Sequence, residues 1–453
     1  MKVENRSIDF IPEDERYGEP RSLFFVWFGA NANITTVAAG VLPISLGLNL
    51  FWSVLSILVG SMIGAVFMAS HSAQGPRLGI PQMIQSRAQF GVFGAIVPLL
   101  FVMLIYLGFF VSNTLLAAQA VATASPFSNE VNIILLGVVC FLVALVGYRF
   151  IHRFQKILSL VSIAVFGFAT VLSLALPIEP GQWTPQGFSL VSFLASVSIS
   201  VTWQLSYAPY VADYSRYLPT RTSTRQVFWY SYLGTVIGGS WMMVLGAMLA
   251  KGVAGFSDNV GLNLVGLMGG GTLLMFGFVL YGQVAINVFN LYGAFMSTVT
   301  VVEPYTQLKV TPFVRAGFML IICAAATGLC TLAQNDFLQF FLNFIFFMSY
   351  FLIPWTAINL VDYYALRKGV YRIADIFDAD GIYGRVNWIA VSVFLITIVL
   401  EIPFMSTSLY TGPVASALQG IDLAWVVGLL IPAGAYYGLM SRYRGSMTAP
   451  VES

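Results

Sequence analysis

Three pairs of aromatic or polar side chains lie at helical spacing inside apolar runs of this sequence. They are Phe109 with Asn113, Trp203 with Ser206, and Asn287 with Asn290. Residues three or four apart lie on one face of a helix. An aromatic ring stacks on a flat solute, and an amide both donates and accepts hydrogen bonds, so it matches a ring edge that carries an amino group beside a ring nitrogen. The pairs therefore predict a site for a heterocycle. The alternative is that they serve packing and hydrogen bonds between helices.

The element that would bring these side chains together is the stretch WFGANANITTVAAG, residues 27–40. Glycines and the amides Asn31 and Asn33 stand there in place of the leucines of an ordinary membrane helix. Backbone without its own hydrogen bonds survives in a bilayer only where it is buried in protein or lines a cavity. We predict a broken helix that lines a solute site, as in secondary transporters, with Asn33 facing the solute. A continuous helix whose asparagines bond neighbouring helices is the alternative.

A second interruption is predicted five spans later, in VSISVTWQLSYAPYVADYSRY, residues 197–217. Pro209 lies inside this segment, where it removes a backbone hydrogen bond and frees a carbonyl. Interruptions at corresponding places in two halves of a chain indicate a site at the middle of the membrane, between inverted repeats.

The composition is that of a polytopic membrane protein. Hydrophobic residues make up 58% of the 453 residues and charged residues 9%, whereas soluble proteins carry about 25% charged residues. Twelve apolar runs are long enough to cross about 30 Å of hydrocarbon. They are residues 23–47, 50–70, 93–121, 131–149, 153–176, 189–212, 227–250, 270–299, 316–333, 337–360, 387–406 and 423–441.

The basic residues predict the orientation of these spans. With the N-terminus in the cytoplasm, 20 of the 21 Lys and Arg residues fall in cytoplasmic segments and only Lys251 does not, as the positive-inside rule requires. Both termini are then cytoplasmic, and the chain lies in the cell membrane. The polar residues 1–22 read as a tail rather than a signal peptide. Because the charges follow the topology, the net charge of +2 does not indicate a nucleic-acid partner.

The residues that would hold a metal or a redox cofactor are scattered. Cys140, Cys323 and Cys330 lie in apolar runs and are expected to be small buried hydrophobes. His71 and His152 both fall in cytoplasmic segments, so no inward-facing ligand cluster is expected. We therefore expect no cofactor and no metal site, which argues against a membrane redox enzyme.

Four carboxylates and three connections are also interpreted from their positions. Asp213, Glu303, Asp362 and Glu401 lie toward the ends of spans and are interpreted as interfacial or capping groups. The segment 70–91 is too polar to cross and predicts an interfacial or partly re-entrant segment. Residues 252–271 predict a short capping helix over the entrance, and 362–386 a solvated connection.

Five segments spread over the whole chain carry a family resemblance. They are IPEDERYG (11–18), HSAQGPRLGIP (71–81), YAPYVADYSRY (207–217), PWTAINLVDYYALRKGVY (354–371) and YGRVNW (383–388). In this order they resemble the nucleobase–cation symporter family 1, of the purine–cytosine permease type. The resemblance implies an all-α polytopic fold of the LeuT type, with a 5+5 inverted repeat and two additional C-terminal helices. It also implies alternating access, with the substrate between spans 1, 3, 6 and 8.

The resemblance carries over to individual residues. The family's stacking aromatic on span 3, usually tryptophan, matches Phe109, and the aromatic on span 6 matches Trp203. The family's amides match Asn113 and Asn290, with Asn287 nearby. The unwound carbonyls of span 1, which face the coupling ion and the substrate, match Gly29, Ala32 and the neighbourhood of Asn33.

One departure from the family bears on the coupling ion. Sodium-coupled members place a Ser/Thr pair on span 8, five to six residues before the asparagine that matches Asn290. Here those positions are Val284 and Ala285, which offer no side-chain oxygen. We therefore predict H+ as the coupling ion, with Na+ as the alternative. The sequence does not identify a residue that carries the proton.

The sequence thus predicts a symporter that imports a nucleobase, cytosine or a purine first, without covalent chemistry. Phe109 and Trp203 would sandwich the ring, while Asn113, Asn287 and Asn290 would read its edges. Carriers of the same fold for allantoin, hydantoins, uracil, vitamin-like pyrimidines or amino acids are the alternatives, and a membrane enzyme or receptor is a remote one. The expected partners are the nucleobase and the lipid bilayer, and no oligomeric state is predicted.

The expected parts follow the spans. They are a cytoplasmic tail (1–22), two five-helix repeats (23–176 and 189–360), two additional helices (387–441) and a cytoplasmic C-terminal tail (442–453).

Overall fold

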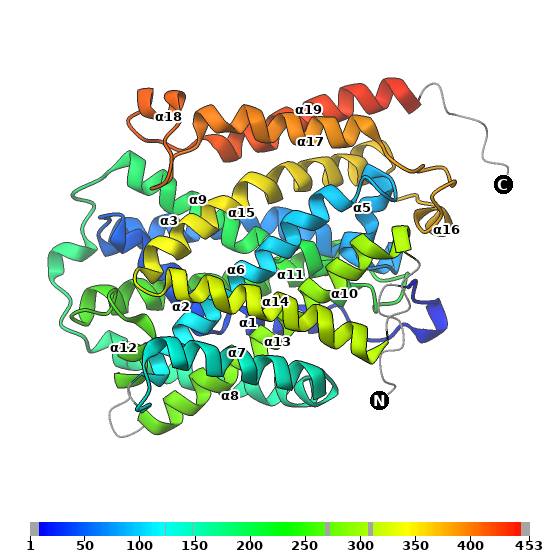
Figure 1. Cartoon of the computed structure of the whole chain (residues 1–453). Helices are drawn as coiled ribbons and strands as arrows, with labels where there is room; N and C mark the ends of the chain where they lie inside the picture. Colours follow the sequence, from blue (N-terminus) through cyan, green and yellow to red (C-terminus); the bar gives the residue numbers. More distant parts are fainter. Residues whose placement is uncertain (1–8, 123, 147, 268–271, 307–310, 445–453) are drawn as a thin grey trace.

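The computed structural model describes residues 9–122, 124–146, 148–267, 272–306 and 311–444 (Figure 1). The regular secondary structure of this part of the chain is helical, apart from one isolated bridge between Ser406 and Thr411. In chain order the helices are α1 (Ser22–Asn31), α2 (Ile34–Ser45), α3 (Leu50–Ser72), α4 (Gly75–Leu78), α5 (Gln82–Phe90), α6 (Ile96–Val121), α7 (Asn129–Val146), α8 (Tyr148–Leu174), α9 (Leu190–Leu205), α10 (Val211–Ser215), α11 (Thr224–Gly252), α12 (Val260–Gly266), α13 (Thr272–Thr306), α14 (Pro312–Ala333), α15 (Phe337–Leu360), α16 (Ile373–Ile376), α17 (Trp388–Glu401), α18 (Pro413–Ala417) and α19 (Ala424–Arg444). Short 3-10 turns are η1 (Glu13–Glu15), η2 (Pro180–Trp183), η3 (Ala208–Tyr210) and η6 (Ile402–Phe404), and a π-helical turn, η5 (Val361–Leu366), continues α15.

Every apolar run predicted from the sequence contains a helix. Among the described residues, eight helices are long and apolar enough to cross a membrane. The pair α1 and α2, bent by 60° at its break, makes a ninth. Three shorter apolar helices fall in the remaining runs, at Asn129–Leu145, Val161–Leu174 and Trp388–Phe404.

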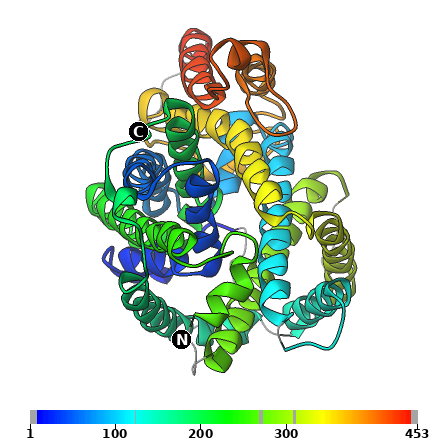
Figure 2. The ribbon, with the colours of Figure 1, turned by 90° about the vertical axis from the view of Figure 1, so that its left-hand side faces the viewer.

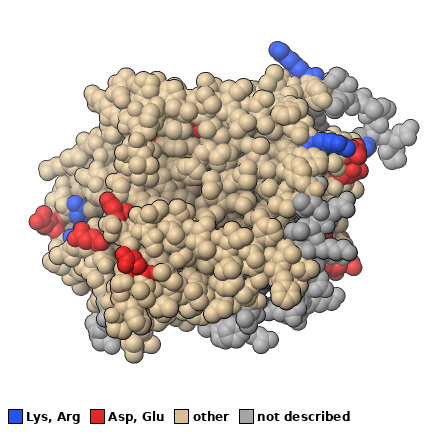
Figure 3. All heavy atoms as spheres, in the orientation of Figure 1, with Lys and Arg blue, Asp and Glu red and all other residues tan. Residues whose placement is uncertain are grey.

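The surface has the character expected of a membrane protein. Charged side chains gather at the two ends of the molecule, and the face between them in Figure 3 is almost free of charge. Apolar side chains are also exposed along one side of α3, for example Leu55, Leu58, Met62 and Val66. An exposed apolar band of this extent is stable only against lipid.

Glycines allow α2 to lie unusually close to α11. A Cβ atom added to Gly40 would lie 1.9 Å from the carbonyl oxygen of Met243. One added to Gly246 would lie 2.0 Å from the carbonyl oxygen of Val37. Small residues at helix contacts let backbones approach in this way. The first span, including its break, is thereby held against α11.

The two C-terminal helices form a separate edge of the bundle. In Figure 2, which looks from one end, α17 and α19 (orange to red) lie together and pack on α15 (yellow). The helix α15 also contacts α6 and α9. It therefore connects this edge with the centre of the molecule.

The connecting segments are more buried than the sequence predicts. All residues of α5 are buried within the protein, and an interfacial or partly re-entrant position of the segment 70–91 stays a prediction. The interpretation of 362–386 as a solvated connection is wrong for part of it, because Ile376 and Tyr383 form a hydrophobic cluster with Ile80 and Ile84. The short helix predicted within 252–271 is confirmed as α12, whose Gly261 N–H donates to Gln119 Oε1 (3.0 Å).

The described part of the N-terminal tail also packs on the bundle. Its Ile11 N–H donates to the carbonyl of Gly79 (2.9 Å), and Tyr17 N–H donates to the carbonyl of Tyr217 (2.7 Å). Residues 1–8 and 445–453, at the ends of the two predicted tails, lie outside the described residues.

The interpretation of the carboxylates needs correction at two positions. Asp362 and Glu401 are both 0% exposed, so neither is a solvated surface carboxylate. Asp362 accepts hydrogen bonds from Arg367, Tyr371, Gln89 and Tyr436. Asp213 does cap a helix, since it accepts from the first N–H of α5 (2.7 Å). The side chains of Glu303 and His152 lie outside the described part, and the three cysteines are buried as predicted.

Candidate functional site

The first span is broken where its sequence predicts. The helix α1 ends at Asn31 and α2 begins at Ile34, with Ala32 and Asn33 between them. The Asn33 side chain accepts from Thr36 N (3.0 Å) and donates to the carbonyl of Ala30 (2.7 Å). Both bonds are local, so Asn33 caps the second half-helix, and its contact with a solute stays a prediction.

The two residues proposed near a coupling ion lie at this break. Ala32 caps the end of α1, and its N–H donates to the carbonyl of Gly29 (3.1 Å). The carbonyls of a last helical turn lack intrahelical donors unless a cap supplies them. At this break the carbonyls of Gly29, Ala30 and Asn31 accept from Ala32 N, Asn33 Nδ2 and Asn33 N, so an ion at Gly29 and Ala32 stays a prediction.

Asn31 connects the break in the first span with the sixth. It is fully buried, and its Oδ1 accepts from Trp203 Nε1 (3.0 Å) and from the Tyr207 hydroxyl (3.1 Å). Its amide donates to the carbonyl of Trp27 (2.9 Å) and to Thr235 Oγ1 (3.2 Å). One asparagine thus uses four hydrogen bonds to hold α1, α9 and α11 together.

The sixth span is interrupted as well. The helix α9 ends at Leu205, and the chain passes through the turn η3 before α10 begins at Val211. Pro209 lies in η3 and has no N–H to continue a helix. Ser206 lies at the end of α9, and its hydroxyl donates to the carbonyl of Trp203 (2.7 Å). This bond is local, so Ser206 stabilises the interruption.

The three asparagines of spans 3 and 8 form one buried network between α6 and α13. Asn113 donates to Asn287 Oδ1 (3.2 Å), and Asn290 donates to the same oxygen (3.3 Å). Asn287 donates to the carbonyl of Phe110 (3.2 Å) and to Thr114 Oγ1 (2.8 Å). Asn290 is 9% exposed, whereas Asn113 and Asn287 are 1% exposed. Asn290 therefore has the fewest protein partners of the three.

The predicted aromatic pair meets edge to face. The ring centroids of Phe109 and Trp203 are 6.0 Å apart with an interplanar angle of 82°. Phe344 of α15 meets Phe109 in the same manner, at 5.2 Å and 89°. Edge-to-face contacts of this kind are a favourable geometry for two aromatic rings that touch each other directly. A flat substrate between Phe109 and Trp203 requires one ring to turn, and the sandwich stays a prediction.

Sequence reasoning missed residues that complete the network. Gln283 Nε2 donates to Thr35 Oγ1 (3.2 Å), and Thr35 donates to Asn113 Oδ1 (2.5 Å). Gln283 lies four residues before Asn287, hence on the same face of α13, and this spacing was a usable signal. Thr35 could not be assigned from the sequence, because its contact depends on how α2 packs against α6 and α13.

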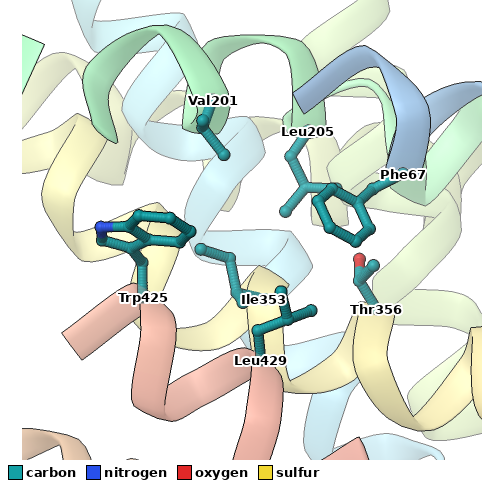
Figure 4. A pocket seen from close by; sticks show the side chains of 7 residues that line it. All are labelled: Phe67, Val201, Leu205, Ile353, Thr356, Trp425 and Leu429. Atoms are coloured by element: carbon teal, nitrogen blue, oxygen red, sulfur yellow. The ribbon is translucent and has the colours of Figure 1, made fainter. Parts of the chain in front are cut away.

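A separate apolar pocket lies between α3, α9, α15 and α19 (Figure 4). Its lining residues are Phe67, Val201, Leu205, Ile353, Thr356, Trp425 and Leu429. Thr356 is the polar member of this set and its hydroxyl is paired with His71 Nε2 (3.3 Å). A pocket of this character does not match a polar heterocycle, so the asparagine network remains the better candidate for a solute site.

Comparisons with known proteins agree with a permease. Residues 10–428 match the family described as permeases for cytosine/purines, uracil, thiamine and allantoin. The chain is 56% identical over 440 residues to YxlA of Bacillus subtilis, which carries the provisional name of a purine-cytosine permease. This match covers 97% of the chain and 96% of that protein. The purine-cytosine permease FCY2 of Saccharomyces cerevisiae is 26% identical over 400 residues, covering 83% of the chain and 74% of FCY2.

A solved structure shows the same fold. It is that of Mhp1, a nucleobase-cation-symport-1 family transporter, in a closed conformation with bromovinylhydantoin bound. It superimposes with a TM-score of 0.76 over 99% of this chain and 97% of Mhp1, at 18% identity. At this identity the comparison concerns the fold alone.

Proposed function

The chain belongs to the nucleobase–cation symporter family 1, as a permease of the cytosine/purine, uracil, thiamine and allantoin group, and we propose that it imports a nucleobase together with a cation. It is a multi-pass membrane protein and a transporter rather than an enzyme, as its relatives are. Cytosine or a purine is the proposed substrate, and alternating access is the proposed mechanism.

The proposed architecture has twelve spans in the cell membrane with both termini in the cytoplasm. Residues 23–176 and 189–360 form the two inverted five-helix repeats in this scheme. The interruptions between α1 and α2 and between α9 and α10 support it, because they fall at corresponding places of the two halves. The distribution of basic residues supports the orientation.

The observation that carries the substrate proposal is the network of buried amides beside two aromatic rings. An amide that donates and accepts can exchange its protein partners for the edge of a nucleobase. Asn290 is the best placed to do so, since one hydrogen bond to Asn287 is the contact found for its side chain. Phe109 and Trp203 lie in contact across α6 and α9 and supply faces for the ring.

H+ is the proposed coupling ion. Val284 and Ala285 of α13 have no side-chain oxygen, and a sodium site needs several oxygen ligands. Concentrative uptake that follows an imposed sodium gradient and ignores a pH gradient would contradict this assignment.

The experiment is uptake of radiolabelled cytosine into proteoliposomes that contain the purified protein. Unlabelled purines, pyrimidines, hydantoins and amino acids are added as competitors, and the internal label is identified by chromatography. We expect unchanged cytosine inside and competition by purines. Competition by hydantoins or amino acids alone would favour another solute of the same fold class, and a chemically altered product would contradict a carrier.

A further inference from the structure

One carboxyl group inside the bundle has no hydrogen-bond partner in the described part of the chain. Glu401, the last residue of α17, is 0% exposed, and neither of its side-chain oxygens has a hydrogen-bond partner. It lies about 20 Å along α17 from Trp388, at the other end of the helix. An ionised carboxylate there would be neither solvated nor paired, and its loss of hydration would cost roughly several kcal/mol. The group is therefore in its protonated, neutral form.

Two titratable groups face Glu401 from the elements packed against α17. They are Asp422, just before α19, and Tyr350 on α15. The helix α5 contacts the opposite end of α17, where Asn387 donates to the carbonyl of Gln89 (2.7 Å). No basic side chain is found against Glu401 among the described residues. The protonation of Glu401 therefore depends on burial and on the charge of Asp422.

Asp422 differs from Glu401 in its partners. Its carboxylate accepts from the Tyr350 hydroxyl (2.6 Å), from Ser406 N (2.8 Å) and from Ala424 N (2.9 Å). Three donors stabilise a negative charge, whereas Glu401 has none. In this pair Asp422 is suited to hold the charge and Glu401 to hold the proton.

The neighbours of Glu401 are shaped around the carboxyl group. A Cβ atom added to Gly428 of α19 would lie 1.8 Å from Glu401 Oε1, so a larger residue there would displace the carboxyl group. Pro354 of α15 lies at the same point, 3.3 Å from that added atom. Pro354 has no N–H, so it cannot donate the bond that the carbonyl of Tyr350 receives in a regular helix. A protonated carboxyl group has an O–H that donates a hydrogen bond, whereas an ionised carboxylate only accepts.

The helix α15 connects this carboxyl with the candidate substrate site. Its Phe344 contacts Phe109 (5.2 Å between centroids), and its Phe341 contacts Trp203 (6.2 Å). The apolar pocket of Figure 4 lies along the face that α15 shares with α19, which is incompletely filled there. A change of charge at the junction of α15, α17 and α19 is thereby placed to shift a helix that touches the aromatic pair.

We propose that Glu401 is the proton-binding residue of this transporter, protonated while α15 lies against α17 and α19. The proton leaves when α15 moves and water reaches the carboxyl group. This inference rests on the proposed proton-coupled uptake of a nucleobase. It assigns the coupling proton to a residue on an additional helix, outside the two repeats.

The test compares wild-type protein with Glu401→Gln in proteoliposomes. Gln keeps the size and neutrality of a protonated Glu but cannot release a proton. We expect the variant to exchange internal for external cytosine at a rate within about twofold of wild type. We expect it to lose both accumulation driven by an inward proton gradient and the cytosine-induced proton entry reported by an internal pH dye.

Matched variants keep the outcome clear. Glu179→Gln removes an exposed carboxyl and is expected to behave as wild type. Glu401→Asp keeps a titratable group and is expected to retain proton entry, which covers the case in which Glu401→Gln fails to fold. Proton-driven accumulation by Glu401→Gln at the wild-type level would overturn the assignment to Glu401 and leave proton coupling intact. Wild-type uptake of cytosine without any response to the proton gradient would instead overturn proton coupling itself.

Discussion

Replacing Asn290 by alanine separates a substrate-binding role from a structural one. The side chain donates one hydrogen bond, to Asn287 Oδ1 at 3.3 Å, and Asn287 keeps its bonds to Asn113, Phe110 and Thr114 after the change. A neutral hydrogen bond contributes about 0.5–1.5 kcal/mol to stability. An amide that pairs with a base edge contributes about 1–3 kcal/mol to recognition, which corresponds to about 5- to 150-fold in affinity.

The assay therefore measures two quantities on Asn290→Ala. Thermal melting in detergent should show a small decrease, and cytosine binding or the KM of uptake should weaken about 5- to 150-fold. Thr300→Val is the control, because Thr300 is a buried residue of the same helix. Among the described residues, the hydrogen bond of its hydroxyl stays within that helix, to the carbonyl of Met296 (2.9 Å). We expect that variant to keep the wild-type KM.

A KM for Asn290→Ala equal to that of Thr300→Val would refute the reasoning, provided both variants reach the membrane. The asparagine network would then act only as a connection between α6 and α13. A large drop in the melting temperature of Asn290→Ala would also count against a specific role in binding, because unfolding would then account for the lost uptake.

Three further predictions concern the framework around the site. Asn31→Ala removes the acceptor of the Trp203 indole N–H and leaves buried donors unpaired, at about 1–3 kcal/mol each; a clear drop in melting temperature and loss of cytosine uptake are expected. Gly40→Ala should abolish folded protein in size-exclusion chromatography, because the added methyl would collide with the backbone of α11, whereas Gly434→Ala meets nothing within 4 Å and should elute as wild type. Asp362→Asn removes the charge that balances the largely buried Arg367, and it should lower the free energy of unfolding by about 3–5 kcal/mol. The measurement is the melting temperature, and an unchanged value would show that the pair is not needed for stability.

Local sequence signals were sufficient for the elements of the fold. Each predicted apolar run contains a helix, because length and hydropathy alone decide whether a segment can lie in lipid. The break in the first span was also predictable, since Asn33 caps a new helix by bonding Thr36 three residues later. The role of Asn33 toward a solute stays a prediction, because local bonds account for its cap and nothing more.

The site depends on contacts that no local pattern encodes. Asn31 bonds Trp203 and Tyr207, more than 170 positions away, and these bonds exist only because α1 and α9 cross at that depth. The perpendicular arrangement of Phe109 and Trp203 likewise follows from how α6, α9 and α15 pack.

The amino-acid sequence by itself determined that this chain lies in a membrane, where its helices run, where the first span breaks and which polar residues lie within apolar runs. Only the tertiary structure decided which of those polar residues have partners. Asp362 and Glu401 look alike in the sequence, yet four side chains donate to Asp362 and none to Glu401. The reason is physical: hydropathy is a property of each residue, whereas the pairing of a buried polar group depends on distant segments that meet only after the helices have packed.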